Sequence, residues 1–434
     1  MKKILYLPTR YFPSISGAEF YLQRMAEILS SRYKYHTDIY TSNAIDFKAL
    51  RSTEGKSIKE KDKFYDIVNN LKINRFPIEN KVSLQEKITY VKNIPEYSLL
   101  DLSDECLKLF LKNGPYLLDL IEYFLNANNK SYDLAHTVFF PYFNLIITLI
   151  LGKIFKIPTI CTPFFHFSNP RYLNERLVEV LRKFDLLIAC TNLEKTFLIN
   201  KCRIDGENVK VIPMGVDMEK FESVNKTKLT NYKFKEKFFK KNENKFKMVL
   251  FCGYKNYEKG AISVLKSIPM ILDKLKKVYF VFIGSSTQAY NRELSKILKI
   301  KNTRIINFTP DNLTGYYDKK KLAAFKETDV YCMPSRSDAF GIAFLEAWAA
   351  GKPVIGANIG ATPEVINNNI DGSLVDFDNP RDIAEKIVKL LKKKRLRKKF
   401  GSAGKKKVSQ NYTWELVAEQ THLTYQKLMK NSTR

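Results

Sequence analysis

The sequence is poor in the residues that usually build metal sites or disulfide frameworks. It has four histidines and six cysteines in 434 residues, and the cysteines are scattered with no Cys-x-x-Cys pair. Most of them lie inside apolar runs that are typical of strands. This pattern argues against zinc and against a disulfide framework, and it favours a reducing compartment. We therefore expect a cytoplasmic protein without a zinc site.

Long hydrophobic runs are also missing. The most apolar window, residues 139–151, is interrupted by Pro141, Asn144 and Thr148, so it is too short to span a bilayer and predicts a buried helix. Only residues 4–8 follow the first lysines as an apolar run, and they predict a strand rather than a signal peptide. No repeat and no low-complexity tract occurs, which excludes solenoid folds.

Acidic residues are outnumbered, because 73 Lys and Arg face 45 Asp and Glu, a net charge of +28. Residues 1–214 hold 30 basic and 23 acidic residues (+7), whereas residues 215–434 hold 43 and 22 (+21). The densest stretch, residues 392–407, has ten basic residues in sixteen. Such a run is suited to anionic lipid head groups or nucleic acid, or it is a solvated helix face. Aromatic residues do not interleave with it, so a base-stacking platform is not indicated.

The length is too great for one core, so we expect two domains. Short apolar runs alternate with helical patterns in both halves of the chain, which predicts an α/β protein with two parallel sheets and right-handed crossovers. In the first half, residues 96–130 carry helical periodicity. A lysine-rich stretch without strand patterns, residues 220–247, separates the two series. We place the domain boundary near residue 215.

Two features of the first half stand at predicted strand ends. The first strand leads through a loop into a helix whose entrance carries Gly17, as expected where a doubly wound sheet meets a phosphate. His166 follows the carboxyl end of a buried strand over residues 158–163, which is where open parallel sheets bind ligands. A single loop glycine and a lone histidine are equally compatible with purely structural roles.

The most informative segment of the second half runs from Met333 to Gly356. It predicts a strand end, a polar turn and a short helix that begins near Gly341, where free backbone N–H groups favour an anion. Asp338 and Glu346 are eight positions apart, about 12 Å of helical rise. That spacing suits the two ends of an extended ligand whose phosphates lie at the helix tip. The alternative is an ordinary strand-turn-helix with solvated acids.

Taken in order, these segments resemble family 4 retaining glycosyltransferases of the GT-B fold over nearly the whole chain. The segments that carry the resemblance are Ser16-Gly17-Ala18-Glu19, His166, Pro213 to Asp217, Lys259-Gly260, Asp338 to Glu346, Gly360 to Glu364, and Tyr412-Thr413-Trp414. The resemblance implies two Rossmann-like, doubly wound parallel-sheet domains facing across a cleft. These would be an acceptor-side domain (1–214), a nucleotide-sugar domain (215–411) and a helix (412–434) that crosses back to the first domain.

The implied activity is transfer of a hexose from a UDP- or GDP-linked sugar to a glycan or a lipid-linked acceptor with same-face attack. The resemblance also implies that no metal and no cofactor are needed, since the nucleotide sugar is a substrate. By resemblance, Glu346 would hold the donor ribose, Asp338 the sugar hydroxyls, and His166 the sugar near its reacting face. Lys259 and the backbone near Gly17 would stabilise the diphosphate. Further donor-binding positions implied by the resemblance are Gly253, Tyr254, Lys255, Phe340, Gly341 and Ile342.

Two positions depart from the family pattern. The first acid is usually Glu, and Asp338 is one methylene shorter; Tyr254 stands where an Arg usually contacts the diphosphate. These departures motivate an alternative, a catalytically silent GT-B module that binds a nucleotide sugar or an anionic surface. Nucleic-acid binding ranks last, because the basic run lacks a reading motif. For the acceptor we expect a membrane-linked molecule, which makes the protein peripheral on the cytosolic face.

Overall fold

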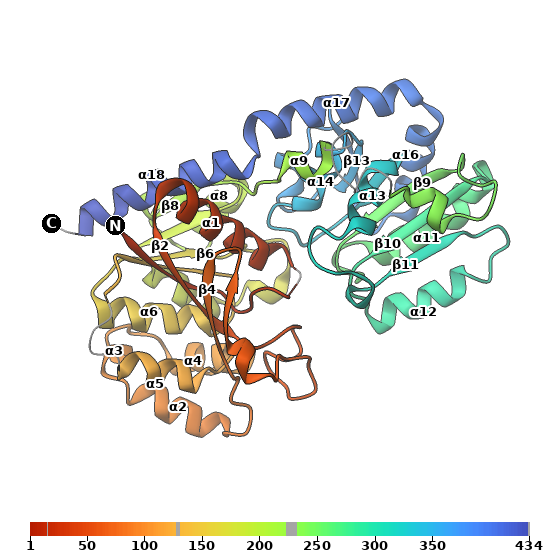
Figure 1. Ribbon diagram of the computed structural model, residues 1–434. Helices are drawn as coiled ribbons and strands as arrows, with labels where there is room; N and C mark the ends of the chain where they lie inside the picture. Colours follow the sequence, from red (N-terminus) through yellow and green to blue (C-terminus); the bar gives the residue numbers. More distant parts are fainter. Residues whose placement is uncertain (15, 127–130, 223–231, 433–434) are drawn as a thin grey trace. The chain divides into compact units, whose positions relative to one another are not determined.

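The computed structural model describes residues 1–14, 16–126, 131–222 and 232–432. The chain forms two compact units, each containing one sheet (Figure 1). Unit 1 comprises Met1–Pro213 and Trp414–Arg434, and unit 2 comprises Met214–Thr413. The sequence placed these boundaries after residues 214 and 411. Parts of the predicted first loop (15), helical stretch (127–130), lysine-rich stretch (223–231) and final helix (433–434) lie outside the described residues.

Unit 1 is built on an eight-stranded sheet of order β3-β4-β2-β1-β5-β6-β7-β8. Its strands are β1 (Lys3–Leu7), β2 (His36–Ser42), β3 (Tyr65–Val68), β4 (Leu71–Phe76), β5 (Leu134–Val138), β6 (Thr159–Thr162), β7 (Leu186–Ala189) and β8 (Val209–Val211). Its helices are α1 (Gly17–Tyr33), α2 (Leu84–Lys92), α3 (Pro95–Ser98), α4 (Asp104–Asn113), α5 (Leu118–Leu125), α6 (Asn144–Phe155), α7 (Glu175–Val178), α8 (Asn192–Asn200) and α18 (Trp414–Ser432).

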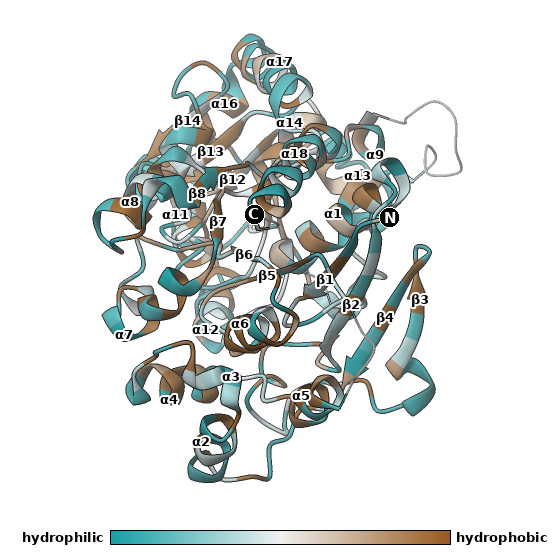
Figure 2. Cartoon of the chain, turned by 90° about the vertical axis from the view of Figure 1, so that its left-hand side faces the viewer, coloured by the Kyte–Doolittle hydropathy of each residue, from teal (hydrophilic) through white to brown (hydrophobic). Residues whose placement is uncertain are grey.

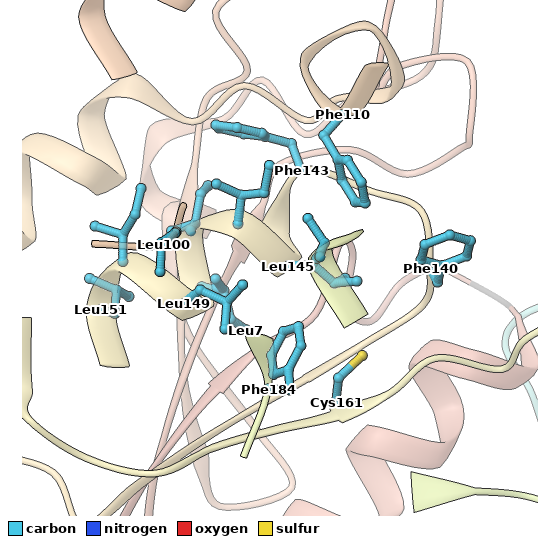
Figure 3. Packing of buried hydrophobic residues seen from close by; sticks show 14 of the residues in the cluster. Leu7, Leu100, Phe110, Phe140, Phe143, Leu145, Leu149, Leu151, Cys161 and Phe184 are labelled. Carbon is cyan, nitrogen blue, oxygen red and sulfur yellow. The ribbon is translucent and has the colours of Figure 1, made fainter. Parts of the chain in front are cut away.

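Successive side chains of β1 point to opposite faces of this sheet. Leu5 and Leu7 belong to the large apolar cluster formed with α4, α5 and α6, whereas Tyr6 hydrogen-bonds Tyr425 of α18. Figure 1 shows α6, with α2 to α5 beyond it, on one face and α1 with α18 on the other. Figure 3 shows the side chains of α6 packed in that cluster. The apolar window 139–151 is therefore a buried helix, as predicted.

The edge of the sheet differs from the prediction of wholly parallel pairing. β3 pairs antiparallel with β4 through a two-residue turn in which both Asn69 (φ 50°) and Asn70 (φ 66°) adopt left-handed conformations. Such turns favour asparagine and match the twist of a hairpin. The strand escaped prediction because Tyr65 and Ile67 are about 70% exposed, so its pattern shows no buried face.

A buried polar network fixes α18 to the sheet. The Tyr425 hydroxyl is hydrogen-bonded to Nδ1 of His136 and lies 3.2 Å from the Tyr6 hydroxyl. Nε2 of His136 lies 2.9 Å from the Thr162 hydroxyl. All four side chains are buried, and the lack of solvent lowers the pKa of His136 to about 3. At the start of α18, Trp414 packs against aromatic rings of α1.

Unit 2 is built on a six-stranded parallel sheet of order β11-β10-β9-β12-β13-β14. Its strands are β9 (Lys247–Cys252), β10 (Val278–Ile283), β11 (Ile305–Phe308), β12 (Val330–Met333), β13 (Val354–Ala357) and β14 (Gly372–Val375). Its helices are α9 (Met218–Glu222), α10 (Phe234–Phe238), α11 (Ala261–Lys274), α12 (Gln288–Ile297), α13 (Lys319–Glu327), α14 (Ile342–Ala349), α15 (Thr362–Val365), α16 (Pro380–Lys392) and α17 (Lys394–Asn411).

The helices of unit 2 form two packed groups. α11 packs against α12 and α16, while α14 packs against α17, α13 and α9. The aromatic ring of Tyr331 in β12 contacts Phe325 of α13 and Phe344 of α14, so that face of the sheet is covered by the second group. The final strand, β14, was not predicted, because its Gly372 and Ser373 resemble a turn.

We predict that His136 makes unit 1 sensitive to acid. It is neutral in the fold, whereas in the unfolded chain it takes up a proton near pH 6.5, so its stability contribution is complete above that pH and decreases toward about pH 3. The slope is about 1.4 kcal/mol per pH unit. In His136→Gln this slope should disappear from the pH dependence of the unfolding free energy.

The measurement is urea unfolding across this pH window in a Trp348→Phe background, which leaves Trp414 as the one tryptophan and a reporter of unit 1. His36→Gln, at a half-exposed histidine on β2, is the matched control and should retain the slope. Equal slopes in His136→Gln and the parent would contradict the prediction.

Candidate functional site

The strand order of unit 2 identifies where a ligand is expected. The chain runs from β9 outward to β11, then returns to β12 on the other side of β9, so β9 and β12 are neighbours at the point where the order reverses. Open parallel sheets bind ligands at the carboxyl ends of such strands. The two loops that leave them span residues 253–260 and 334–341. They contain most of the predicted donor-binding residues.

These two loops are locked against each other. Gly260 has φ +76°, and a Cβ placed on it would lie 2.3 Å from the Pro334 carbonyl oxygen, so only glycine fits there. The backbone N–H of Arg336 donates to the Glu258 carbonyl at 2.8 Å. The Arg336 guanidinium also donates to the Glu258 carboxylate through Nε and Nη2. The loops therefore form one rigid platform.

Lys259 and Asp338 meet on this platform. Nζ of Lys259 donates to the Asp338 carboxylate at 2.8 Å and to the Ser337 carbonyl at 2.9 Å. Both side chains are largely buried, with 21% of Lys259 and 13% of Asp338 exposed. Among the described residues, no group accepts the third ammonium hydrogen. A cation oriented by two partners and still able to donate is suited to an anionic ligand.

The tip of α14 follows directly. Gly341 has φ +94° and lies at the N-terminal end of the helix, where no side chain caps the free N–H groups. A Cβ on Gly341 would lie 2.5 Å from the Phe344 ring, so this position also requires glycine. Phe340 is buried, with its ring 5.5 Å from that of Tyr412. The helix begins at Ile342, as predicted, with the positive end of its dipole at the platform.

Glu346 lies one turn further along α14 and is almost fully buried. Its Oε1 accepts a hydrogen bond from Nζ of Lys321 in α13 at 2.7 Å, and both residues are under 10% exposed. The Lys321 ammonium also lies 3.7 Å from the centre of the Tyr316 ring. Burial, and then the Glu346 carboxylate, raise the pKa of Tyr316 well above its usual range. The predicted ribose-binding acid is thus one member of a buried ion pair.

The strand-end residues Gly253, Tyr254 and Lys255 differ in what they offer. Gly253 directly follows β9, and a Cβ placed on it would lie 3.2 Å from the Met333 sulfur. Tyr254 is 48% exposed. Lys255 is fully buried, and its Nζ donates to the Asn307 side chain at 2.7 Å and to the Phe308 carbonyl at 2.9 Å.

The donor contact of Lys255 stays a prediction, and in this structure its ammonium has two partners within unit 2. Its ammonium holds the loop after β9 against the end of β11, and burial lowers its pKa to about 8. Lys259 is the lysine of this loop that is partly exposed, with 21% of its side chain accessible. Tyr254 stands where the resemblance leads us to expect an arginine.

In unit 1 the strand order reverses between β1 and β5, and the loop after β1 leads into Gly17, the first residue of α1. The Glu19 carboxylate is 2% exposed and accepts a hydrogen bond from Nε of Arg10 at 2.9 Å. Ser16, which stands where the family often has a second glycine, bonds Glu19 as well. The guanidinium of Arg10 lies 3.6 Å from the centre of the Phe47 ring.

His166 follows β6, as predicted, and its ring lies 5.1 Å from that of Tyr172. Phe164, two residues earlier, has φ +47°, a strained conformation for a phenylalanine. The loop is held by Glu194, whose fully buried carboxylate accepts from the backbone N–H of Phe165 at 2.8 Å and of Cys190 at 2.7 Å. Glu194 therefore positions the backbone that carries His166.

Within the described parts of the chain, no three His, Cys, Asp or Glu side chains are grouped so that they could hold a metal ion. None of the described helices combines the length and hydropathy needed to cross a bilayer.

Two family models match the chain. Residues 90–220 match the model described as Glycosyltransferase Family 4, and residues 233–407 match that of Glycosyl transferases group 1. The chain is a family 4 glycosyltransferase. The recognition made from Gly17, His166, Lys259 and the Asp338–Glu346 segment is therefore confirmed, as is its description as an enzyme.

Known relatives agree with the family. An uncharacterised glycosyltransferase of Methanocaldococcus jannaschii is 22% identical over 98% of this glycosyltransferase and 99% of that protein. A phosphatidyl-myo-inositol mannosyltransferase of Mycobacterium leprae is 30% identical over 42% of the chain and 46% of its own length. The crystal structure of Anabaena HepE in complex with UDP and glucose superimposes with a TM-score of 0.70 at 16% identity, covering 99% and 100% of the two chains. Such neighbours confirm the GT-B fold.

Sequence reasoning missed Lys321, Glu194 and Arg336. Lys321 had a usable signal, because it shares a helical face with the buried Ala324 and Phe325, so a lysine occupies a core position of α13. Glu194 follows Thr191 at the spacing of a capping box, although its carboxylate bonds elsewhere. Arg336 had no signal, because its partner Glu258 is 78 residues away.

Replacement of Gly260 should separate the two loops of the platform. Gly260→Ala introduces both a left-handed alanine and a clash with Pro334, and we expect unit 2 to lose about 3 kcal/mol or more. Gly351→Ala is the matched control, because Gly351 has a similar φ (+69°) but nothing lies within 4 Å of its Cβ position. The control should lose only about 1 kcal/mol.

Urea unfolding followed by Trp348 fluorescence in a Trp414→Phe background measures unit 2 alone. Equal losses in the two alanine variants would show that the close approach of the loops does not matter.

Proposed function

We propose that this enzyme transfers a hexose, with retention of anomeric configuration, from a nucleotide diphosphate sugar to a lipid-linked or glycan acceptor. The observation that carries the proposal is the meeting of Lys259 and Asp338 on the platform at the switch point of unit 2, directly before the Gly341 tip of the helix that contains Glu346. An ammonium, an uncapped helix terminus and two acids in this order match a ligand with a diphosphate between two hydroxylated groups.

The chemistry follows from charge. As the bond between the anomeric carbon and the diphosphate oxygen breaks, the electron pair stays on that oxygen and negative charge grows there. Fixed positive groups aimed at this oxygen lower the barrier. Lys259 and the N–H groups at the start of α14 are the groups we assign to this role, and the backbone at Gly17 is the contribution we assign to unit 1.

The acceptor hydroxyl then forms its new bond to the anomeric carbon on the face that the diphosphate leaves. Its proton passes to the departing diphosphate, so no protein carboxylate has to become covalently attached. Asp338 is assigned to the sugar hydroxyls and His166 to the sugar near its reacting face. In this scheme the positive groups replace a metal ion, so we propose metal-independent transfer.

The ribose assignment rests on Glu346. Nζ of Lys321 donates to its Oε1 at 2.7 Å, which fixes the orientation of the carboxylate. A carboxylate with a fixed orientation accepts hydrogen bonds from neighbouring hydroxyls such as those of a ribose. We therefore propose Lys321 as a positioning residue that acts through Glu346.

A UDP-linked donor is supported by the crystal structures of Anabaena HepE with UDP and with UDP-glucose. A lipid-linked acceptor is supported by the relative named phosphatidyl-myo-inositol mannosyltransferase. Together these favour a peripheral enzyme that works on the cytosolic face of a membrane. The competing proposal, a silent module that binds a nucleotide sugar without transfer, is motivated by the shortened acid Asp338 and by Tyr254.

Nucleotide binding and transfer test the proposal directly. UDP should raise the melting temperature of the protein, because a ligand that binds only the folded state stabilises it, and GDP in place of UDP would reassign the base. In a donor screen, Glu346→Ala, Lys259→Ala and His166→Ala should each lose transfer by about a hundredfold or more. The exposed Lys276→Ala is the control.

Full transfer by all three variants would refute the site assignment. Nucleotide-sugar binding with no turnover on any acceptor would favour the silent module over the enzyme.

Lys321→Met should separate stability from donor binding. It leaves the Glu346 carboxylate buried without its counter-charge, so unit 2 should lose about 3 kcal/mol. UDP binding, measured by calorimetry, should weaken by roughly tenfold or more, since a hydrogen bond to a charged group is involved. Adding Glu346→Gln should restore stability but leave UDP binding weak.

Lys319→Met, at an exposed lysine on the same helix, should change neither quantity. If Lys321→Met bound UDP as tightly as the parent, Lys321 would be a structural residue only.

A further inference from the structure

The outer face of α17 has an unusual charge pattern. Residues 392–407 contain ten basic residues, and no Asp or Glu occurs between 392 and 411. The neighbouring helix α16 is different, because Asp382 and Glu385 stand among its basic residues. Helix stability alone favours such mixing, since like charges one turn apart repel. The absence of acids is therefore a property of α17 and not of every helix in this basic chain.

Arg397 and Lys407 are used inside unit 2. Nη1 of Arg397 donates to the carbonyls of Leu390 and Leu391 at 2.7 Å, which fixes the start of α17 to the end of α16. Nζ of Lys407 donates to the Asp371 carboxylate at 2.6 Å. These residues belong to the packing of α17 and are not available to an external partner.

The inner face of α17 is fixed by two glycines. A Cβ on Gly401 would lie 2.0 Å from the Gly351 carbonyl oxygen, and one on Gly404 would lie 1.9 Å from Cδ1 of Trp348. The helix is thus in close contact with α14 and with the turn that follows it. Because it cannot rotate about its axis in that contact, the face that points to solvent is determined.

That outward face is cationic along most of its length. Lys394 and Lys398 form one row at helical spacing, and Arg395, Lys399 and Lys406 form a second row beside it. Figure 2 colours much of α17 in the teal of hydrophilic residues. The exposed basic residues of this cationic face, including the two that precede the helix, are Lys392, Lys393, Lys394, Arg395, Lys398, Lys399 and Lys406.

The start of the helix is also hollowed. A shallow, open hollow there is lined by Lys393, Lys394, Arg395, Leu396 and Lys399. Four of these five side chains are cationic. The surface of the hollow is mostly apolar, so the aliphatic parts of these side chains form it, and the rows of charge, not the hollow, provide the attraction for an anionic surface.

We propose that the cationic face of α17 docks the enzyme on an anionic lipid bilayer. Six of the seven exposed cations are lysines, whereas planar, bidentate recognition of single phosphates favours arginine. Phe400, the aromatic residue of the run, is buried, so no ring is available to stack on a base. A flexible lysine array along a helix of about 27 Å fits a planar field of charge.

This inference rests on the proposed function in one respect. The proposed lipid-linked acceptor lies in a membrane, and docking would bring the enzyme to it. The docking itself requires no sugar transfer. Vesicle binding and transfer are therefore measured separately, and failure of one is distinguishable from failure of the other.

The test is co-sedimentation of the full chain with vesicles of phosphatidylcholine alone and of phosphatidylcholine mixed with phosphatidylglycerol. We expect binding to the mixed vesicles at low salt, loss of binding at high salt, and none to the neutral vesicles. The triple variant Lys394→Gln, Lys398→Gln and Lys399→Gln should bind roughly a hundredfold more weakly, since each basic residue near an anionic surface contributes about fivefold.

The matched control replaces three exposed lysines elsewhere in unit 2, Lys240, Lys241 and Lys245, by Gln and makes the same change in net charge. It should retain vesicle binding. Equal losses in both triple variants would mean that net charge, and not α17, drives binding, and would overturn the proposal. Salt-sensitive binding of RNA or DNA by the full chain, without any vesicle binding, would also overturn the proposal. Both variants should still bind UDP as the parent does.

Discussion

The platform formed by the loops after β9 and β12 depends on one close approach, that of Gly260 to the carbonyl of Pro334. Two loops from neighbouring strands touch there through backbone atoms, and the left-handed glycine is the device that allows it. The contact also brings the two charged side chains together. Lys259 precedes the glycine, Asp338 lies four residues after the proline, and Nζ of Lys259 donates to the Asp338 carboxylate at 2.8 Å. Without the contact, the loops would still be joined by the bonds between Glu258 and Arg336, but the close backbone approach beside Lys259 would be lost.

Local sequence patterns predicted the features that are determined by residues close together in the chain. The strand-turn-helix around Gly341, the buried helix α6 and the position of His166 after β6 all follow from periodicity and turn residues. The resemblance then supplied the order of the motifs. What it could not supply is pairing across the chain, because the partners lie far apart in sequence. Lys321 meets Glu346 from another helix, and Glu194 reaches the loop of His166 across two strands.

Lys255 shows the limit most clearly. Alternation along an extended strand left its direction open, since the residue stands where the strand gives way to a loop. The structure turns it inward, where two oxygens at the end of β11 satisfy its ammonium. The lysine that follows β9 is thus part of the scaffold of unit 2. The missed strand β3 has the opposite cause, because its exposed Tyr65 and Ile67 lack the buried face on which strand prediction relies.

Two groups of cations in unit 2 differ in how much water surrounds them: the paired lysines Lys321 and Lys259, and the exposed cations of the α17 face. Lys321 and Lys259 are buried or nearly so, each is held by named partners, and their fields are strong and directional because little water screens them. The cations of the α17 face lie in solvent, where salt screens each one and only their number gives an effect. The net charge of +28 consequently says little about the donor platform, since a few desolvated groups govern it. It bears instead on the surfaces the enzyme can approach, and α17 is where that excess is arranged on one fixed face.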